Sequence, residues 1–219
     1  KIRKIYSEFK SNIDIKKKYA VAVSGGPDSM ALVFLSKCLS LLDSYKFTYY
    51  MVDHKLRKES TIEAKKVFLL LKKNSIKLKI LTWRGKKPSS NIQAIARTKR
   101  FLLLEKACKK DGINYLMLGH HIDDLYENFF IRLLRGSGLK GLTSFGKISK
   151  YKDNKFLILR PLINLEKNQL LYLSDKVFNF FIEDPSNLKE KFKRVKIRNL
   201  ITSFKNEGLN KQKLNLTIK

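Results

Sequence analysis

Six consecutive residues near the N-terminus have the residue types of a phosphate-binding loop: Ser24, Gly25, Gly26, Pro27, Asp28 and Ser29. The start of a helix offers free backbone N–H groups and a partial positive charge, and both suit an anion. Paired glycines let the backbone approach a phosphate closely, and the two serines add hydroxyl donors. The alternative is an ordinary turn between a strand and a helix, because all these residue types favour turns.

Two better-known phosphate loops do not fit this segment. A Walker A loop requires Gly-Lys-[Ser/Thr], which does not follow here. A dinucleotide-binding loop requires the spacing G-x-G-x-x-G, which the segment lacks. We therefore expect residues 24–29 to bind phosphates in the manner of another class of nucleotide-binding proteins.

A second group of chemically capable residues has a spacing of three: His121, Asp124 and Glu127. On a helix this spacing places the side chains on one face, and the group follows an apolar run that predicts a strand. Two carboxylates beside a histidine can hold a cation, accept a proton or bind a metal. The alternative is a solvated helix start, where acidic residues are favoured in any case. We predict no zinc or other metal site made by side chains alone, and we interpret His120 as a neighbour of the site.

Positive charge is the main feature of the composition. The 219 residues include 47 Lys and Arg against 19 Asp and Glu, which gives a formal net charge of +28. Such an excess indicates a polyanionic partner, most simply nucleic acid, although lysine enrichment from an AT-rich genome would also produce it. Arginine is more informative, because its planar fork of donors suits phosphate and carboxylate. Arg97 and Arg100 could contact the phosphates of a bound ligand or of RNA, and Arg194 and Arg198 could contact RNA phosphate.

The elements that must position these residues alternate between strand and helix. Short apolar runs predict strands at residues 19–24, 47–52, 77–83, 115–119 and 155–160. Helical spacing predicts helices at residues 29–42, 60–74, 92–110, 122–135, 166–178 and 192–204, with a lead-in helix within 1–18. This alternation predicts an α/β fold with a Rossmann-like parallel sheet flanked by helices, followed by a small helical C-terminal extension.

Several local signals refine these elements. Residues 60–63 (STIE) have the capping-box pattern, and Asn91 suits a helix N-cap. Residues 135–138 (RGSG) could form a backbone anion nest or a flexible loop. The polar tail after Phe204 predicts a frayed end.

Composition excludes several classes of protein. Hydrophobic residues make up 43% of the chain, which excludes a wholly disordered protein. The apolar runs are far shorter than the roughly 20 residues that span a bilayer, and no signal peptide opens the sequence, so we expect no membrane partner. Cys38 and Cys108 match no metal or redox spacing, and the cytoplasm is the expected compartment.

The loop over residues 24–29 resembles the PP-loop of the N-type ATP pyrophosphatases. Further motifs follow in order: VDHKLR (52–57), AIARxxRF (94–101), GHHIDDxxE (119–127), RGSGLxGL (135–142), RPL (160–162), EDxSN (183–187) and RxxxR (194–198). Together they resemble the tRNA(Ile)-lysidine synthase family over residues 19–200. The resemblance implies an adenine nucleotide alpha hydrolase-like fold, with a lead-in segment (1–18), a PP-loop ATP pyrophosphatase domain (19–150) and the end of the catalytic region plus the helical extension (151–219).

The resemblance also implies a reaction, catalysed by a ligase that forms a carbon–nitrogen bond. Its substrates would be Mg-ATP, the wobble cytidine of a tRNA(Ile) with a CAU anticodon, and free L-lysine. Oxygen 2 of the cytidine would attack the α-phosphate and expel pyrophosphate. The lysine ε-amine would then attack carbon 2, and AMP would leave as lysidine forms.

Roles for individual residues follow from the same resemblance. Ser24, Gly25, Gly26, Pro27, Asp28 and Ser29 would bind ATP, and Asp28 would also orient Mg²⁺ or the loop. Asp124 or Glu127 would bind the lysine ammonium and help to remove its proton. His121 and Arg97 complete the expected catalytic set, while Glu183 and Asp184 are the next candidates for the amino-acid site.

Three other functions stay open at this point. A tRNA thiolase would use the same adenylylation, but such enzymes usually need cysteine pairs or an iron–sulfur cluster, and Cys38 and Cys108 supply no C-x-x-C. An amide-forming synthetase would need an ammonia source. A non-catalytic basic RNA-binding domain would explain the charge but not the loop at residues 24–29. The sequence does not predict an oligomeric state.

Overall fold

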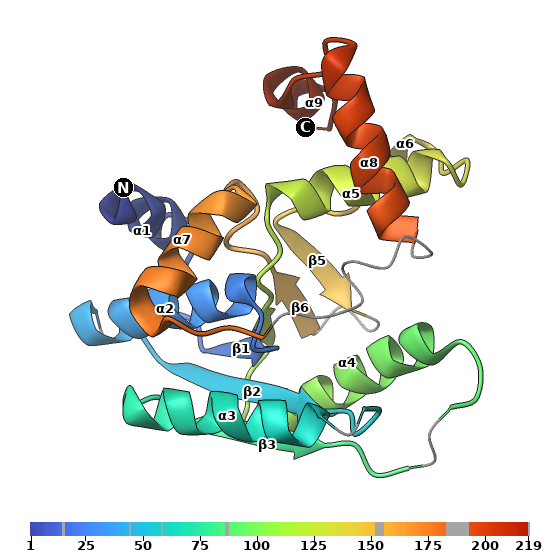
Figure 1. Ribbon diagram of the computed structural model, residues 1–219. Coiled ribbons are helices and arrows are strands. Elements are labelled where there is room, and N and C mark those ends of the chain that lie inside the picture. The colour runs from blue at the N-terminus through green and yellow to red at the C-terminus, as the bar shows by residue number, and fades with distance from the viewer. Residues whose placement is uncertain are drawn as a thin grey trace.

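The computed structural model describes residues 1–14, 16–43, 45–57, 59–85, 88–151, 156–182 and 193–218. These residues form a six-stranded sheet with the order β3-β2-β1-β4-β6-β5 (Figure 1). In chain order the strands are β1 (Tyr19–Val23), β2 (Phe47–Asp53), β3 (Leu78–Thr82), β4 (Tyr115–Met117), β5 (Ile148–Tyr151) and β6 (Phe156–Leu159). All neighbouring pairs are parallel except β5 with β6. The predicted Rossmann-like α/β architecture is confirmed.

Helices cover both faces of this sheet, because its strands carry apolar side chains on both sides. On one face lie α1 (Ile2–Lys10), α2 (Pro27–Leu42), α3 (Ser60–Lys73) and α7 (Lys167–Phe178), which share a core with Val21 and Val23. On the other face lies α4 (Ile92–Lys110), which packs against Ala20 and Tyr50. Val21 and Ala20 are consecutive, so they point to opposite faces as the period of a strand requires.

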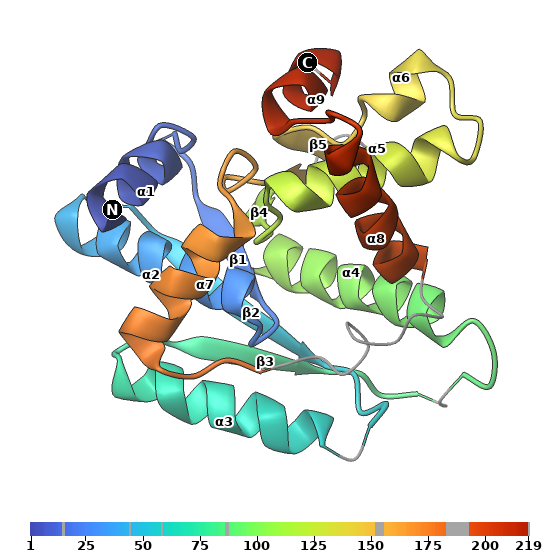
Figure 2. The same ribbon diagram turned by 45° about the horizontal axis from the view of Figure 1, so that its top comes forward.

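The remaining helices form a smaller cluster at one end of the molecule. They are α5 (Ile122–Leu133), α6 (Leu139–Leu142), α8 (Lys193–Asn206) and α9 (Lys211–Ile218). Figure 2 shows α8 crossing α5, with the start of α8 directed toward α4. Tyr126 and Phe130 of α5, Ile197 of α8, and Leu214 and Ile218 of α9 are buried together. The predicted helical extension is confirmed.

One prediction about the end of the chain is wrong, and one strand at the edge of the sheet was not predicted. The tail is not frayed, because Leu214 and Ile218 give α9 an apolar face that packs on α5. The sequence analysis also missed β5, whose residues ISKY alternate between half-buried and exposed and whose Ile148 is 52% exposed. An edge strand of four residues with so little buried surface leaves a weak sequence pattern.

The predicted cap of α3 is also wrong, and the predicted cap of α4 is right in its position only. Ser60 donates its hydroxyl to Asp53 Oδ1 (3.1 Å) instead of capping α3, and the carboxylate of Glu63 pairs with Arg57 at 2.9 Å. The buried carboxylate of Asp53 attracts Ser60 more strongly than the helix start does. Asn91 occupies the N-cap position of α4 in a left-handed conformation (φ 47°), but its side chain caps no N–H group.

Two further observations concern the whole chain. No described helix is long and apolar enough to cross a membrane. β5 ends at Tyr151 and pairs with β6, so one sheet runs through the predicted boundary between residues 150 and 151. The division into 1–18, 19–150 and 151–219 stays a prediction.

Candidate active site

The candidate site lies where the three central parallel strands end. β1 runs into residues 24–29, its neighbour β4 runs into His120 and His121, and the next strand, β6, runs into Arg160. Ligands of open α/β sheets bind at this carboxyl edge. The fold therefore brings the two predicted groups together and adds Arg160 to them.

The predicted phosphate loop has the conformation of a helix start. Its two serines are linked, because the Ser24 backbone N–H and hydroxyl each donate to Ser29 Oγ at 3.1 Å, and Ser29 donates to Gly26 O at 2.9 Å. Gly26 is the N-cap residue of α2, and Pro27 occupies the first turn. The helix thus begins two residues earlier than predicted, which turns its positive end toward the loop.

The backbone at Ile182, which follows α7, holds this loop in place. Gly25 has φ +84°, and its carbonyl accepts a hydrogen bond from the Ile182 N–H at 2.9 Å. A Cβ at Gly25 would lie 2.5 Å from Ile182 Cδ1. Gly25 is thus required both for its left-handed conformation and for this close approach.

A cavity of about 530 Å³ opens in front of the loop. Its volume lies within the roughly 300–1,000 Å³ of typical small-molecule sites. The loop forms one wall through Ser24, Gly26, Asp28 and Ser29, and α4 forms another through Gln93, Ala96 and Arg100. The apolar side chains that line it are suited to a flat aromatic base, and they include Met51, Val52, Leu104 and Leu118. We refer to this space as the loop cavity.

Two arginines line the loop cavity, and one of them, Arg100, has no acidic partner among the described residues. Arg100 lines it, and its Nε is buried with no hydrogen-bond partner among the described residues. Burial, together with the charges of Arg97 and Arg194, lowers the pKa of Arg100 to about 10, so the side chain stays charged near neutral pH. Arg97, the arginine predicted to be catalytic, is exposed and lies outside the cavity lining. An anion in the cavity would relieve this concentration of positive charge.

Asp28 offers a carboxylate oxygen to the loop cavity. Its Oδ1 is buried and accepts no hydrogen bond from the described part of the chain. Carboxylate oxygen is the ligand type that Mg²⁺ prefers, and Mg²⁺ in nucleotide sites commonly takes one or two carboxylates plus phosphates. The described residues contain no cluster of three or more His, Cys, Asp or Glu that could hold a metal. Asp28 fits a Mg²⁺ ion that a bound nucleotide would bring.

His121 links the loop to the start of α5. Its Nε2 lies 3.7 Å from Asp28 Oδ2 and 3.5 Å from Asp124 Oδ2, and its Nδ1 lies 3.4 Å from Asp123 Oδ2. Burial opposes the charged form, but the carboxylates of Asp123, Asp28 and Asp124 outweigh it and raise the pKa of His121 to about 10. The imidazolium therefore holds three acids together near neutral pH.

The charge on His121 should make stability depend on pH. A folded His121 keeps its proton to about pH 10, whereas an unfolded histidine loses it near 6.5. The stabilisation is therefore complete below pH 6.5 and is lost as the pH rises through about 10, with a slope of up to about 1.4 kcal/mol per pH unit. Urea unfolding of the wild type and His121→Gln, without Mg²⁺ or nucleotide, measures the difference. A difference that stays constant between about pH 7 and 9, where an unfolded histidine is neutral, would show that folded His121 is neutral there too.

The two predicted lysine-binding acids lie in different surroundings. Asp124 lines the loop cavity, and its Oδ2 accepts the His121 backbone N–H at 3.1 Å. Glu127 is 3% exposed, and its Oε1 accepts from Arg198 Nε at 2.5 Å. Arg194 lies 3.8 Å from Asp124 and 4.0 Å from Glu127. Both arginines that we expected at RNA phosphates therefore lie against these acids.

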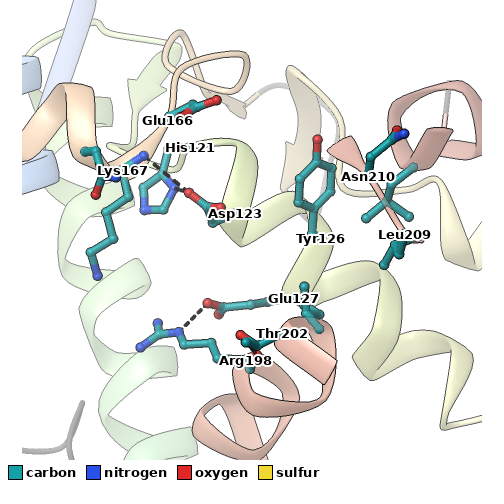
Figure 3. Close-up of a pocket in the computed structure, with 13 residues that line it drawn as sticks. His121, Asp123, Tyr126, Glu127, Glu166, Lys167, Arg198, Thr202, Leu209 and Asn210 are labelled. Carbon is teal, nitrogen blue, oxygen red and sulfur yellow. Dashed lines mark hydrogen bonds and ion pairs between the residues drawn. The ribbon is translucent and has the colours of Figure 1, made fainter. Parts of the chain in front are cut away.

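Glu127 faces a second cavity, of about 310 Å³, between α5, α7, α8 and α9 (Figure 3). In Figure 3, Arg198 points to the Glu127 carboxylate, and Asp123 points to His121. The lining carries both signs of charge, through Asp123, Glu127, Glu166, Lys167 and Arg198. Such a lining suits a small zwitterion rather than a nucleotide. His121 borders this second cavity and contacts Asp28 and Asp124 of the loop cavity, so the two spaces adjoin.

Some predicted features do not contribute as expected. The N–H groups of Gly136 and Ser137 donate to Leu133 O and Arg132 O, where they close the end of α5, so neither is available to an anion. Glu183 and Asp184 lie outside the described residues.

The sequence analysis assigned no role to Arg160 and set His120 aside. Their positions directly after two neighbouring strands were the signal that could have singled them out.

Comparison with known proteins agrees with this geometry. The PP-loop domain family matches residues 1–204. The chain belongs to the PP-loop family. This family agrees with the interpretation of residues 24–29 as a PP-loop, and the binding of a nucleotide in the loop cavity stays a prediction.

Relatives with assigned activities point to one branch of this PP-loop family. The chain is 41% identical over 187 residues to the tRNA(Ile)-lysidine synthase of Orientia tsutsugamushi, with 85% of this chain and 42% of that protein covered. It is 35% identical over 214 residues to the tRNA(Ile)-lysidine synthase of Rhodopseudomonas palustris, with coverage of 97% and 60%. The chain thus spans about half the length of these relatives.

A solved structure supports the PP-loop fold. The U34-tRNA thiolase NcsA from Methanococcus maripaludis, with its [4Fe-4S] cluster, superposes with a TM-score of 0.79 at 18% identity, covering 94% of this chain and 74% of that one. At this identity the likeness concerns the fold alone. In this chain Cys108 lies on the buried face of α4, Cys38 lies on α2, and neither lines the loop cavity.

Proposed function

We propose that this chain catalyses the ATP-dependent ligation of lysine to carbon 2 of the wobble cytidine in a tRNA(Ile) with a CAU anticodon. One observation carries the proposal. The loop cavity, which Arg100 lines without an acidic partner among the described residues, adjoins a smaller cavity of mixed charge, and His121 connects the two. A reaction that joins a nucleotide-activated base to an amino acid needs two such adjacent spaces. The likeness to tRNA(Ile)-lysidine synthases supports the same function.

In the first step the PP-loop and the arginines act on the phosphates of ATP. Oxygen 2 of cytidine forms a bond to the α-phosphorus, and the bond to the leaving pyrophosphate breaks. Negative charge then spreads over the phosphate oxygens, where the N–H groups at the start of α2 and the Arg100 guanidinium stabilise it. Asp28 would hold a Mg²⁺ ion, which supplies additional positive charge at the phosphates.

In the second step the mixed-charge cavity would hold lysine beside the activated base. The ε-ammonium would lie at the acids, and the α-carboxylate would face Lys167, since Arg198 is already paired with Glu127. An ammonium with a pKa near 10.4 must lose a proton before it attacks, and the carboxylate of Glu127 or Asp124 would accept that proton. The amine nitrogen then bonds to carbon 2, the bond from carbon 2 to oxygen breaks, and AMP leaves with that oxygen.

The RNA would approach over the basic surface between α4 and α8. The cytidine must leave its stack to reach the α-phosphate, so a single-stranded anticodon loop is the expected element. Arg97 is exposed on α4, and Arg194 is 43% exposed on α8. Both could contact RNA phosphates while Arg100 faces the nucleotide. A thiolase is the less supported candidate, because no thiol lines the loop cavity. We expect the protein to act in the cytoplasm.

Pyrophosphate release under three conditions tests the proposal. We expect release with ATP, Mg²⁺ and an unmodified tRNA(Ile) transcript that carries the CAU anticodon, and we expect AMP and lysidine only after lysine is added. A transcript with uridine at the wobble position is the matched control and should support neither step. Sulfur incorporation from a persulfide donor, with no dependence on lysine, would instead identify a thiolase.

A further inference from the structure

Arg160 is a buried cation without an acidic partner. Its side chain is 5% exposed, no ion pair joins it to a carboxylate of the described residues, and Asp124 acts on it only as a nearby charge. One terminal nitrogen donates to Gly146 O at 2.9 Å and to Ser149 Oγ at 3.0 Å, and Nε is enclosed without a partner. Buried charges are normally paired, so this arrangement indicates a function.

His120 is the polar neighbour that Arg160 affects most directly. Phe145 connects them, because its ring centroid lies 4.2 Å from the Arg160 guanidinium carbon and 5.2 Å from the His120 ring centroid. His120 lines the loop cavity, while its Nδ1 is enclosed with no partner in the described part of the protein. The nitrogen that the ring can present to a bound ligand is therefore Nε2.

Positive groups face His120 from three elements. They are Arg160 after β6, Arg194 on α8, and Arg97 and Arg100 on α4. Burial and these four charges hold the pKa of His120 well below its usual value. A proton on the enclosed Nδ1 would lie in a positive environment with no acceptor. The lone pair is thus favoured at Nδ1, and the proton at Nε2.

We propose that His120 is a further ligand of the nucleotide, a neutral imidazole whose Nε2–H donates to a phosphate oxygen, and that Arg160 is the positioning residue that fixes this tautomer. The inference rests on the proposed function only in that the loop cavity binds ATP. His120 would then add a directional donor to the charges of the arginines. Because the ring is already neutral, the contribution of His120 to nucleotide binding would not change as the pH falls past the ordinary pKa of histidine.

Nuclear magnetic resonance of the histidine rings tests this directly, since the chain has three histidines. In ¹⁵N-histidine protein without ligand, we expect the His120 ring to be neutral, with the proton on Nε2, from about pH 5.5 to 8. His120→Gln identifies its signals. Addition of the non-hydrolysable analogue AMPCPP with Mg²⁺ should shift the Nε2–H signal of His120 and leave its tautomer unchanged.

A pair of variants tests the part played by Arg160. Arg160→Gln should raise the pKa of His120 toward its usual value, because a buried positive charge that acts on the ring is removed. Arg160→Lys keeps the charge and should preserve the neutral ring, and Arg3→Gln, on the exposed face of α1, is the control for net charge. Thermal unfolding of each variant shows whether it is folded.

Three results would overturn the inference. They are a wild-type His120 that titrates near pH 6.5, a proton on Nδ1, or a His120 signal that does not respond to AMPCPP while other signals at the PP-loop shift. The wild-type measurements need no variant, so they decide the matter even if Arg160→Gln does not fold. None of them involves lysine or tRNA, so failure here would leave the lysine-dependent assay free to support the proposed function.

Discussion

Gly26→Ala is expected to lower pyrophosphate release by about 100-fold or more while the protein stays folded. Gly26 has φ −71° and ψ 162°, which alanine adopts readily. An added Cβ would lie 3.7 Å from Ser24 Oγ and 3.9 Å from Ile182 O, so the protein has room for it. A nucleotide phosphate drawn against the loop would not have that room, and its distance from the N–H groups would increase. Pyrophosphate release and AMPCPP affinity measure the effect.

A matched control exists for this substitution. Gly138 is also an N-cap residue, with φ −62° and ψ 170°, and a Cβ there meets no atom within 4 Å. Gly138→Ala should bind AMPCPP normally. Asp28→Asn should give a loss of pyrophosphate release similar to that of Gly26→Ala, since it removes the free carboxylate charge at the loop. Folded variants that release pyrophosphate at the wild-type rate would contradict the assignment of the PP-loop as the reaction site.

Glu127→Gln is expected to raise the lysine concentration needed for lysidine formation, with ATP affinity nearly intact. A charged hydrogen bond lost at a buried site costs about 1–3 kcal/mol, which is about 5- to 150-fold in the lysine requirement. Glu127 is 3% exposed and lines the mixed-charge cavity, whereas ATP binding depends on the PP-loop. Steady-state assays that vary lysine and ATP separately measure both quantities, and adenylylated tRNA should accumulate.

Two comparisons show whether Glu127 acts on lysine or only supports the fold. Arg198→Gln breaks the same ion pair but keeps the carboxylate, so it should not raise the lysine requirement as Glu127→Gln does. Asp124→Asn should affect lysine less, because Asp124 lines the loop cavity and contacts His121. An unchanged lysine dependence in both acid variants would place the amino-acid site elsewhere, with Glu183 and Asp184 as the next candidates.

Sequence patterns predicted the features that depend on neighbouring residues. The PP-loop is one, because its hydrogen bonds join Ser24, Gly26 and Ser29 within six residues. The parallel sheet is another, since each strand and the helix after it have distinct periods. The predicted cap at Ser60 was wrong because Asp53, which precedes Ser60 by seven residues, accepts its hydroxyl. A local motif does not include such a competing partner.

Contacts between distant segments could not be predicted in this way. Arg198 and Glu127 are 71 residues apart, and the spacing of His121, Asp124 and Glu127 shows a shared face without showing what covers it. The same holds for Ile182, which reaches Gly25 from beyond α7. Arg160 could be seen only as an arginine after a strand, because its lack of an acidic partner depends on the packing of Phe145 and β5.

The separate apolar cluster of α5, α8 and α9 has a consequence for cooperativity. The helix that carries Asp124 and Glu127 takes its apolar support from Ile197, Leu214 and Ile218, and not from the main core beneath the PP-loop. Such units can open by local unfolding at a lower free energy than the whole domain. Loss of this apolar cluster would therefore affect the acids of α5 without affecting nucleotide binding at the PP-loop. A protein whose terminal helices had detached could keep its sheet and its nucleotide while losing the order of the acids that the second half of the reaction requires.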